Sequence, residues 1–175
     1  MSVRYCSPRL LRAEHEITDF KCRSTEQTEW LKRYSRQSMS QGTTRVMVVT
    51  EGDSLRVVAY YAWCMAQIRF DDAPERLRKG TGRYPQPIAL LARLGVDVRH
   101  ERRGIGAALL QDVFARILTL SEDIGCRGLL VHAESEDARK FYLHLVPEFQ
   151  PSPLDPLDLV LLMKDIRRSL GGGSL

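Results

Sequence analysis

Residues 88–120 read IALLARLGVDVRHERRGIGAALLQDVFARILTL, and this stretch decides the fold. Its first part, Ile88–Val98, is an apolar run that follows two prolines and predicts a buried strand. Its last part has apolar residues at helical spacing and predicts an amphipathic helix. The turn between them is basic and carries Gly104 and Gly106, which let a ligand approach the backbone closely. A strand, a glycine-containing turn and a helix N-terminus together predict a site for a phosphate or pyrophosphate.

The G-x-G pattern is a weak signal by itself, because a tight packing turn would show it equally well. The dinucleotide fingerprint needs a third glycine where this chain has Leu109, and the P-loop signature is absent. Three arginines in the turn, Arg99, Arg102 and Arg103, favour the phosphate site. The lack of an acidic residue in the first turn of the helix favours it too.

The stretch LGVDVRHERRGIGAALL resembles the acetyl-coenzyme A (acetyl-CoA) signature Q/R-x-x-G-x-G/A of the GCN5-related N-acetyltransferase (GNAT) family. The resemblance implies an α/β fold with a mixed, mostly antiparallel central sheet, flanked by helices, with acetyl-CoA as co-substrate. The fourth and fifth strands splay apart in that fold, and here they would be about Ile88–Val98 and Arg127–Ala133. Glu101 stands where the motif usually has Gln or Arg, and the arginines that follow it could replace the missing charge.

The resemblance also implies which residues contact the coenzyme. They lie at the end of the fourth strand, in the motif turn, in the first turn of the helix and in one later helix: Val96, Asp97, Val98, Arg103, Gly104, Ile105, Gly106, Ala107, Ala108 and Phe141. A backbone N–H group near Val96–Val98 would stabilise the oxyanion of the tetrahedral intermediate.

A second set of motifs resembles the acetyltransferase toxins of bacterial toxin–antitoxin modules, over about residues 10–163. Arg23 stands where those toxins usually have Gly, and Gln27-Thr28 replaces a Leu-Asp pair. The matching residues are Phe20, Cys22, Trp30, Leu31, the Arg83–Pro87 and Leu91–Asp97 segments, and Ala138–Tyr142.

Such toxins transfer acetyl to the α-amine of aminoacyl-tRNA and thereby block translation. The position matching their catalytic tyrosine is Tyr142, which would give a proton to the departing coenzyme thiolate. Without the resemblance, Phe141 and Tyr142 would be interpreted as two core aromatics. An α-amine with a pKa near 7.8 is about one-third unprotonated at pH 7.5, so little general-base help is needed. Candidate bases near these motifs are Asp97, Glu134 and Glu136.

Two other functions stay open at this point. One is an ordinary GNAT enzyme for a small amine or a protein N-terminus, and the other is a catalytically silent module that binds acyl-CoA or tRNA. The resemblance also implies a cognate antitoxin, usually of the ribbon-helix-helix type, and a homodimer.

The basic residues favour an anionic macromolecule such as charged tRNA, since the net charge is +4. Solvated arginines on loops are the simpler explanation of each basic segment taken alone. Arg93 lies inside a buried strand, so it must pair within the protein or face the acceptor. The expected tRNA contacts are Arg93, Arg76, Arg78, Lys79, Arg83 and Arg36.

The length of 175 residues predicts one domain, residues 1–165, and a flexible tail, residues 166–175. The chain lacks a signal peptide and any apolar run of about 18 residues, so it is expected to be soluble and cytoplasmic, with no membrane contact. Its four widely spaced cysteines predict neither a disulfide framework nor a metal site. His132 and His144 are assigned no role.

The remaining pattern predicts two further helices and three strands. A capping box at Ser24 opens a helix whose core face would carry Trp30, Leu31 and Tyr34. Ser135 caps a second helix. The strands are residues 45–50, residues 55–70, apolar enough to be covered on both faces, and residues 157–163; a polar loop follows at residues 71–86.

Overall fold

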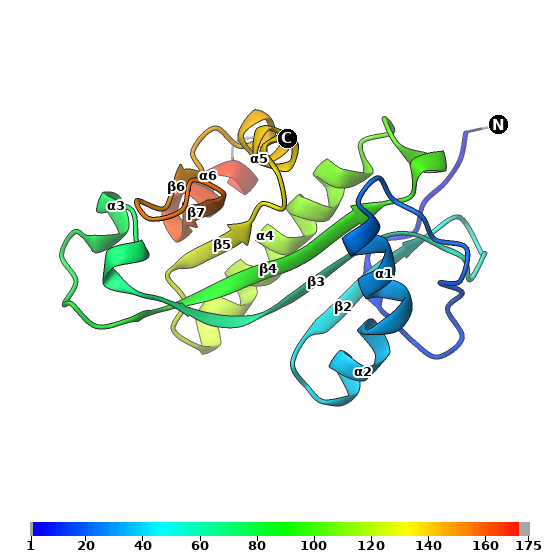
Figure 1. Ribbon diagram of the computed structural model, residues 1–175, viewed down its shortest axis with the longest axis horizontal. Coiled ribbons are helices and arrows are strands. Elements are labelled where there is room, and N and C mark those ends of the chain that lie inside the picture. Colours follow the sequence, from blue (N-terminus) through cyan, green and yellow to red (C-terminus); the bar gives the residue numbers. More distant parts are fainter. Residues whose placement is uncertain (1, 172–175) are drawn as a thin grey trace. The chain divides into compact units, whose positions relative to one another are not determined.

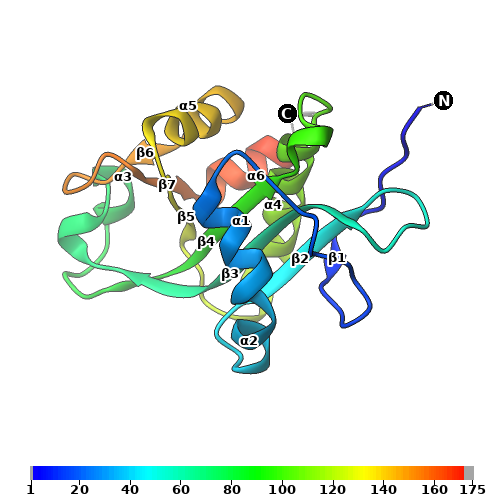
Figure 2. The same cartoon turned by 45° about the vertical axis from the view of Figure 1, so that its right-hand side comes forward.

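The computed structural model describes residues 2–171 (Figures 1 and 2). Within these residues seven strands form a sheet in the order β1-β2-β3-β4-β5-β7-β6, mostly antiparallel, with β4 and β5 parallel. The strands are β1 (Arg9–Leu10), β2 (Arg45–Thr50), β3 (Val57–Ile68), β4 (Gln86–Val96), β5 (Gly128–His132), β6 (Gln150–Pro151) and β7 (Asp158–Leu162). The helices are α1 (Thr25–Arg33), α2 (Ser35–Ser40), α3 (Glu75–Arg78), α4 (Ile105–Asp123), α5 (Glu136–Leu145) and α6 (Met163–Gly171). This is the mixed α/β fold predicted from the sequence.

The chain packs as two compact units that share β3, β4 and α4. Unit 1 extends to Cys64 and includes Ala92–Leu110, and unit 2 contains Met65–Leu91 and the chain from Gln111 onward. The single domain expected over residues 1–165 stays a prediction. None of the helices in the described part of the chain has the length and apolar character needed to cross a bilayer.

Unit 1 has its core between α1 and the β2–β3 hairpin, with α2 lying beside β2 (Figures 1 and 2). The Oγ of Ser24 accepts a hydrogen bond from the N–H of Gln27 at 3.0 Å, so the predicted cap begins α1. Leu31 is fully buried, and the ring of Trp30 stacks on Tyr60. Tyr34 is 54% exposed, so its predicted core position is wrong. The reason is that α1 ends at Arg33 and the chain turns there into α2.

The first half of β3 is buried at every position, as a strand covered on both faces would be. From Trp63 to Gln67 the residues are less buried, and Met65 is 45% exposed, whereas Ile68 at the end of the strand is buried in the core of unit 2. The change coincides with the start of β2 at Arg45, directly opposite Trp63, so that beyond this point β3 has lost β2 as its neighbour on one edge. The prediction of two covered faces is therefore confirmed for half of the strand.

Unit 2 has a core to which β4, β7 and α3 contribute, including the fully buried Leu77. The segment predicted as a polar loop therefore contains a short helix with an apolar anchor. The predicted flexible tail is wrong for residues 166–171, which belong to α6. Met163 and Ile166 lie one helical turn apart and are both buried, which holds α6 in place. Residues 172–175 of the predicted tail lie outside the described residues.

The parallel pairing of β4 with β5 is short. It joins Ala89–Leu91 to Leu129–Val131, whereas β4 continues to Val96. This limited pairing agrees with the predicted separation of the fourth and fifth strands. The strand ends two residues earlier than predicted, because Val98–His100 form a 3₁₀ turn.

Candidate functional site

The turn before α4 has the backbone geometry of an anion site. Arg102 and Gly104 both have positive φ, 61° and 77°. The carbonyl of Gly104 accepts a hydrogen bond from the N–H of Ala108 at 3.0 Å, so Gly104 is the N-cap residue of α4. A Cβ at Gly104 would meet nothing within 4 Å, so the surface is open at this point. Glycine is favoured there because of the positive φ, and not because of a lack of space. Since the first N–H groups of α4 lack intrahelical partners and its first turn is free of acidic residues, an anion is favoured there.

The predicted coenzyme contacts around this turn fall into two groups. Gly104 and the four residues Ile105–Ala108 are consecutive at the start of α4. Arg103 instead donates a hydrogen bond from Nη1 to the hydroxyl of Tyr5 at 2.8 Å, and the same hydroxyl bonds Nδ1 of His100 at 2.8 Å. This contact ties the N-terminal segment to the motif turn. Tyr5 had no sequence signal, because nothing local to it indicates a partner 98 residues away.

Asp97 holds the turn that follows β4. Its carboxylate is fully buried and accepts the N–H of Lys21 at 3.1 Å, the N–H of Arg99 at 2.9 Å and two guanidinium donors of Arg99 at 2.8 Å each. Burial alone would raise the pKa of Asp97, but the hydrogen bonds from Arg99 and Lys21 outweigh it and lower this pKa to about 2. Because both oxygens of Asp97 are engaged by Arg99 and Lys21, we assign this residue the structural role of holding the turn.

The backbone N–H groups predicted to meet the oxyanion are only partly available. The N–H of Asp97 donates to the carbonyl of Val58 at 2.8 Å, and the N–H of Val98 donates to the carbonyl of Lys21 at 2.9 Å. Along a strand, successive N–H groups point to opposite sides, so the N–H of Val96 points away from that of Asp97. Two of the three predicted donors are thus engaged within the protein, and the use of the Val96 N–H by an oxyanion stays a prediction.

The motif segment Asp19–Arg23 packs against this turn and against β4. A Cβ on Gly95 would lie 3.3 Å from Sγ of Cys22 and 3.5 Å from the ring of Phe20. A side chain at Gly95 would therefore be tightly packed against these buried groups, which shows how closely the segment approaches β4. The segment ends in an ion pair in which Nε of Arg23 donates to both carboxylate oxygens of Glu101, at 2.8 and 3.1 Å.

Tyr142 lies on α5, which begins at Ser135 as predicted, and its ring is 7% exposed. The ring makes edge contacts with Phe141 and Phe149, at centroid distances of 5.2 and 6.0 Å. Burial, and then the negative charge of Glu134, raises the pKa of Tyr142. The phenol therefore stays protonated at neutral pH, which is the state that a general acid needs.

Two of the arginines predicted to contact tRNA are engaged inside unit 1. Arg93 donates to Glu26 at 2.6 Å and lies over the ring of Trp30, 5.6 Å from its centroid. Of the two alternatives for Arg93, the structure contains the internal pair. Arg36 donates to two backbone carbonyls of the loop before α1, among them that of His15 at 2.8 Å.

Some of the basic residues of unit 2 are also engaged within the protein, and others are exposed. Arg76 forms a two-point ion pair with the buried carboxylate of Asp165. The guanidinium groups of Arg78 and Arg83 lie over the ring of Phe70, 5.0 and 5.2 Å from its centroid. Among the predicted tRNA contacts of unit 2, Lys79 and Arg83 have exposed side chains.

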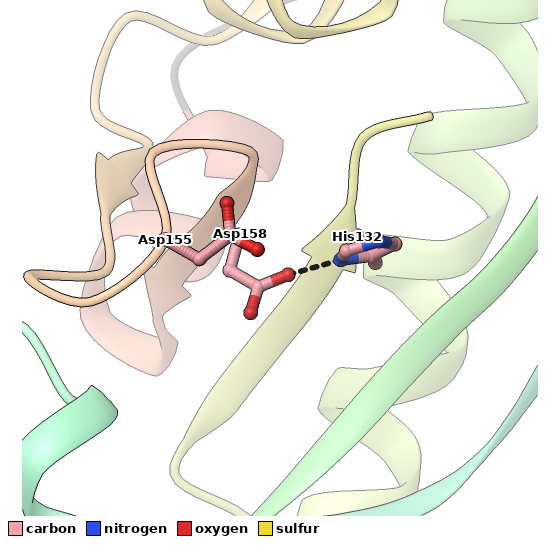
Figure 3. Close-up of side chains that lie close together, drawn as sticks. All are labelled: His132, Asp155 and Asp158. Carbon is pink, nitrogen blue, oxygen red and sulfur yellow. Dashed lines mark hydrogen bonds and ion pairs between the residues drawn. The ribbon is translucent and has the colours of Figure 1, made fainter. Parts of the chain in front are cut away.

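A further polar cluster lies at the ends of β5 and β7, where His132, Asp155 and Asp158 point toward one another (Figure 3). Within residues 2–171 these three side chains could together hold a metal ion, since their ligand atoms lie within 4.8 Å of one another. His132 and Asp158 are register partners joined by an ion pair, and Asp155 accepts the N–H of Leu157 at 2.9 Å. These contacts account for the cluster without an ion, and the expected lack of a metal stays a prediction.

The relatives of this chain identify its family. It is 36% identical over 167 residues to a tRNA-acetylating toxin of Mycobacterium tuberculosis, a match that covers 95% of this chain and 98% of the relative. The chain belongs to the tRNA-acetylating toxins. No protein-family profile matches it. The resemblance to GNAT toxins in the sequence is thereby confirmed.

Solved structures of similar toxins share the fold. AtaT complexed with acetyl-methionyl-tRNAfMet superposes with a TM-score of 0.83 at 21% identity, over 95% of this chain and 98% of that one. A tyrosine-to-phenylalanine mutant of AtaT, bound to acetyl-CoA and to the C-terminus of the antitoxin AtaR, gives 0.78 at 20% identity, over 99% and 100%. At these identities the likeness establishes the fold, which is the predicted GNAT fold of this toxin family.

Proposed function

We propose that this chain is an acetyl-CoA-dependent N-acetyltransferase that acetylates the α-amine of aminoacyl-tRNA and so blocks translation. The observation that carries this function is the 36% identity to a tRNA-acetylating toxin along 95% of the chain. The anion-binding turn before α4 and the buried, protonated Tyr142 support it independently.

The residues around Gly104 suit the phosphates of the coenzyme. The positive φ of Gly104, its open surface and the N–H groups of α4 would hold a pyrophosphate. The bound acetyl-CoA supplies an acyl group already activated as a thioester. The N–H of Val96 stabilises the negative charge that develops on the carbonyl oxygen as the amine adds.

Tyr142 keeps its proton until the carbon–sulfur bond breaks and then donates it to the sulfur. A raised phenol pKa makes full proton transfer less favourable, unless the thiolate is desolvated to a similar degree and its own pKa rises with it. The α-amine needs no strong base, because about a third of it is already unprotonated at pH 7.5. This division of roles agrees with the structural function of Asp97.

The acceptor and the partners complete the proposal. Lys79 and Arg83 extend from exposed positions of unit 2 and are the proposed contacts to tRNA phosphates. AtaT binds the antitoxin AtaR, which supports a cognate antitoxin for this chain as well. A ribbon-helix-helix antitoxin, a homodimer and a cytoplasmic location belong to the same proposal.

The test is acetyl transfer from labelled acetyl-CoA to a pool of charged tRNAs, with the intact protein and Tyr142→Phe compared. Label on the aminoacyl group that is lost in the variant supports both the reaction and the acid. Transfer that survives the substitution keeps the reaction and removes Tyr142 from it.

The alternatives give different outcomes. Acetyl-CoA binding without transfer to any tRNA favours an enzyme for a small amine or a protein N-terminus, which free amino acids and peptides would then reveal. Failure to bind acetyl-CoA in isothermal titration calorimetry favours the catalytically silent module.

A further inference from the structure

Arg23 and Glu101 are two positions at which this chain departs from the usual residues of its family, and they contact each other. We propose that Arg23 is a phosphate-binding residue of the acetyl-CoA site, and that Glu101 positions its guanidinium group. This inference rests on the proposed function, since it adds a residue to the coenzyme site.

The charge of Glu101 is the first argument. It lies three residues before Gly104, in the turn that leads to the N-terminus of α4. A carboxylate at this place repels a phosphate, and its side chain is 24% exposed, so solvent screens it only in part. The ion pair with Arg23 offsets this charge and makes the turn compatible with a bound anion.

The unused donors of Arg23 are the second argument. A guanidinium group has five N–H donors, and Glu101 accepts from Nε. The side chain of Arg23 is 73% exposed, and within residues 2–171 Glu101 is its one ion-pair partner. Its two Nη groups are therefore open to solvent beside the turn, with the planar geometry that binds phosphate oxygens well.

The attachment of the backbone is the third argument. The segment that carries Arg23 is fastened to the turn that carries Glu101 by the N–H of Lys21 on Asp97 at 3.1 Å, and by the N–H of Val98 on the carbonyl of Lys21 at 2.9 Å. A guanidinium donor of Arg99 also bonds the carbonyl of Asp19 at 3.0 Å. Arg23 is thus held beside the turn by more than its own flexible side chain.

An ordinary exposed ion pair would contribute little to stability and nothing to coenzyme binding. Removing either partner of such a pair would have the same small effect. A positioned phosphate ligand predicts opposite effects, because loss of Arg23 removes a cation and uncovers a carboxylate, whereas loss of the Glu101 charge removes a repulsion.

The experiment is titration of acetyl-CoA into the full chain by calorimetry, at several salt concentrations. The variants are Arg23→Ala, Glu101→Gln and the double variant. The control is Arg33→Ala, which breaks an exposed ion pair with Glu29 in the same N-terminal region, on α1. Thermal unfolding checks that each variant is folded.

We expect Arg23→Ala to weaken acetyl-CoA binding by about tenfold or more and to reduce its salt dependence, since a charge-assisted hydrogen bond is lost. Glu101→Gln keeps an acceptor for Nε and should tighten binding. The double variant should recover only the part of the loss that comes from the uncovered Glu101 carboxylate and should stay weaker than Glu101→Gln alone, because the hydrogen bond from Arg23 is still missing. Arg33→Ala should bind as the intact protein does.

Two results would overturn the inference while the proposed function stands. They are intact-protein affinity in Arg23→Ala, and a loss in Glu101→Gln as large as that in Arg23→Ala. Because Gln at position 101 still accepts a hydrogen bond from Arg23, the Glu101→Gln variant should fold. A loss of acetyl-CoA affinity in this variant would therefore contradict the inference even if Arg23→Ala fails to fold. If the intact protein itself binds no acetyl-CoA, the proposed function fails and the inference fails with it.

Discussion

Arg76 donates two hydrogen bonds to the carboxylate of Asp165, at 2.9 and 3.3 Å, and Asp165 is only 1% exposed. The pair joins α3 to α6 within unit 2. Removing the arginine leaves a buried carboxylate that has lost its main partner, so we expect Arg76→Ala to lower the free energy of unfolding by about 3 kcal/mol. The value is at the low end of the usual range because Arg168 lies 3.8 Å from the same carboxylate. Urea unfolding measures the change.

The matched control is Arg69→Ala, which breaks an exposed pair with Asp72 at 3.7 Å. Such a pair contributes at most about 1 kcal/mol. Equal effects of the two substitutions would mean that Arg76 is an ordinary surface arginine, and it would then regain its place among the proposed tRNA contacts.

The low pKa of Asp97, about 2, makes part of the stability depend on pH. A carboxyl whose pKa is lowered by folding stabilises the protein at every pH above its ordinary pKa, and this contribution is lost as the pH falls toward 2. The difference from the ordinary value of 3.8 corresponds to about 2 kcal/mol. We expect the free energy of unfolding to fall between pH 5 and pH 2, and to fall by about 2 kcal/mol less in Asp97→Asn.

Chemical unfolding at pH 5, 4, 3 and 2 measures this slope. Asp97→Asn will also be less stable at every pH, because an amide cannot accept all four hydrogen bonds that the carboxylate accepts. Asp53→Asn, in an exposed turn, serves as the control. An unchanged pH slope in Asp97→Asn would contradict the low pKa.

The raised pKa of Tyr142 predicts the alkaline side of the pH–rate profile. Because the phenol keeps its proton at higher pH than an ordinary tyrosine does, the acid form remains available near pH 10. Acetyl transfer to charged tRNA should therefore rise with deprotonation of the α-amine, with a midpoint near pH 7.8, and show no loss centred near pH 10. A loss centred there would show that the phenol titrates normally.

The strand, turn and helix around Gly104 could be predicted because their signals are local. Apolar runs, a helical period and glycine in a turn act over a few residues, and the strand, turn and helix that they predict are all present, with the strand shifted by two residues. The buried tyrosine and the cap at Ser135 were recognisable for the same reason. Charged contacts were not, because a sequence does not show which carboxylate an arginine will meet.

The arginines illustrate this limit. Arg93, Arg36 and Arg76 were expected to contact tRNA, but each has partners within the protein that are distant in the chain. The helix α6 was missed because it ends in the first of three consecutive glycines and its apolar face is short. Burial of the apolar face of α6 within unit 2 stabilises the helix despite its weak local signal.

In unit 2, Arg76 is paired with Asp165, and Arg78 is half-buried and donates to the carbonyl of Asp71 at 3.0 Å. Lys79 and Arg83 are therefore the residues of unit 2 to test for tRNA binding. Both are exposed, and Arg83 additionally lies over the ring of Phe70. We expect Lys79→Glu with Arg83→Glu to weaken binding of charged tRNA by about tenfold or more and to make its dependence on salt less steep by about two phosphate contacts. Because both residues lie outside the ion pair of Arg76 with Asp165, thermal stability should change little. Filter binding at several salt concentrations measures both effects, and an unaltered salt slope would exclude this segment from the tRNA contact.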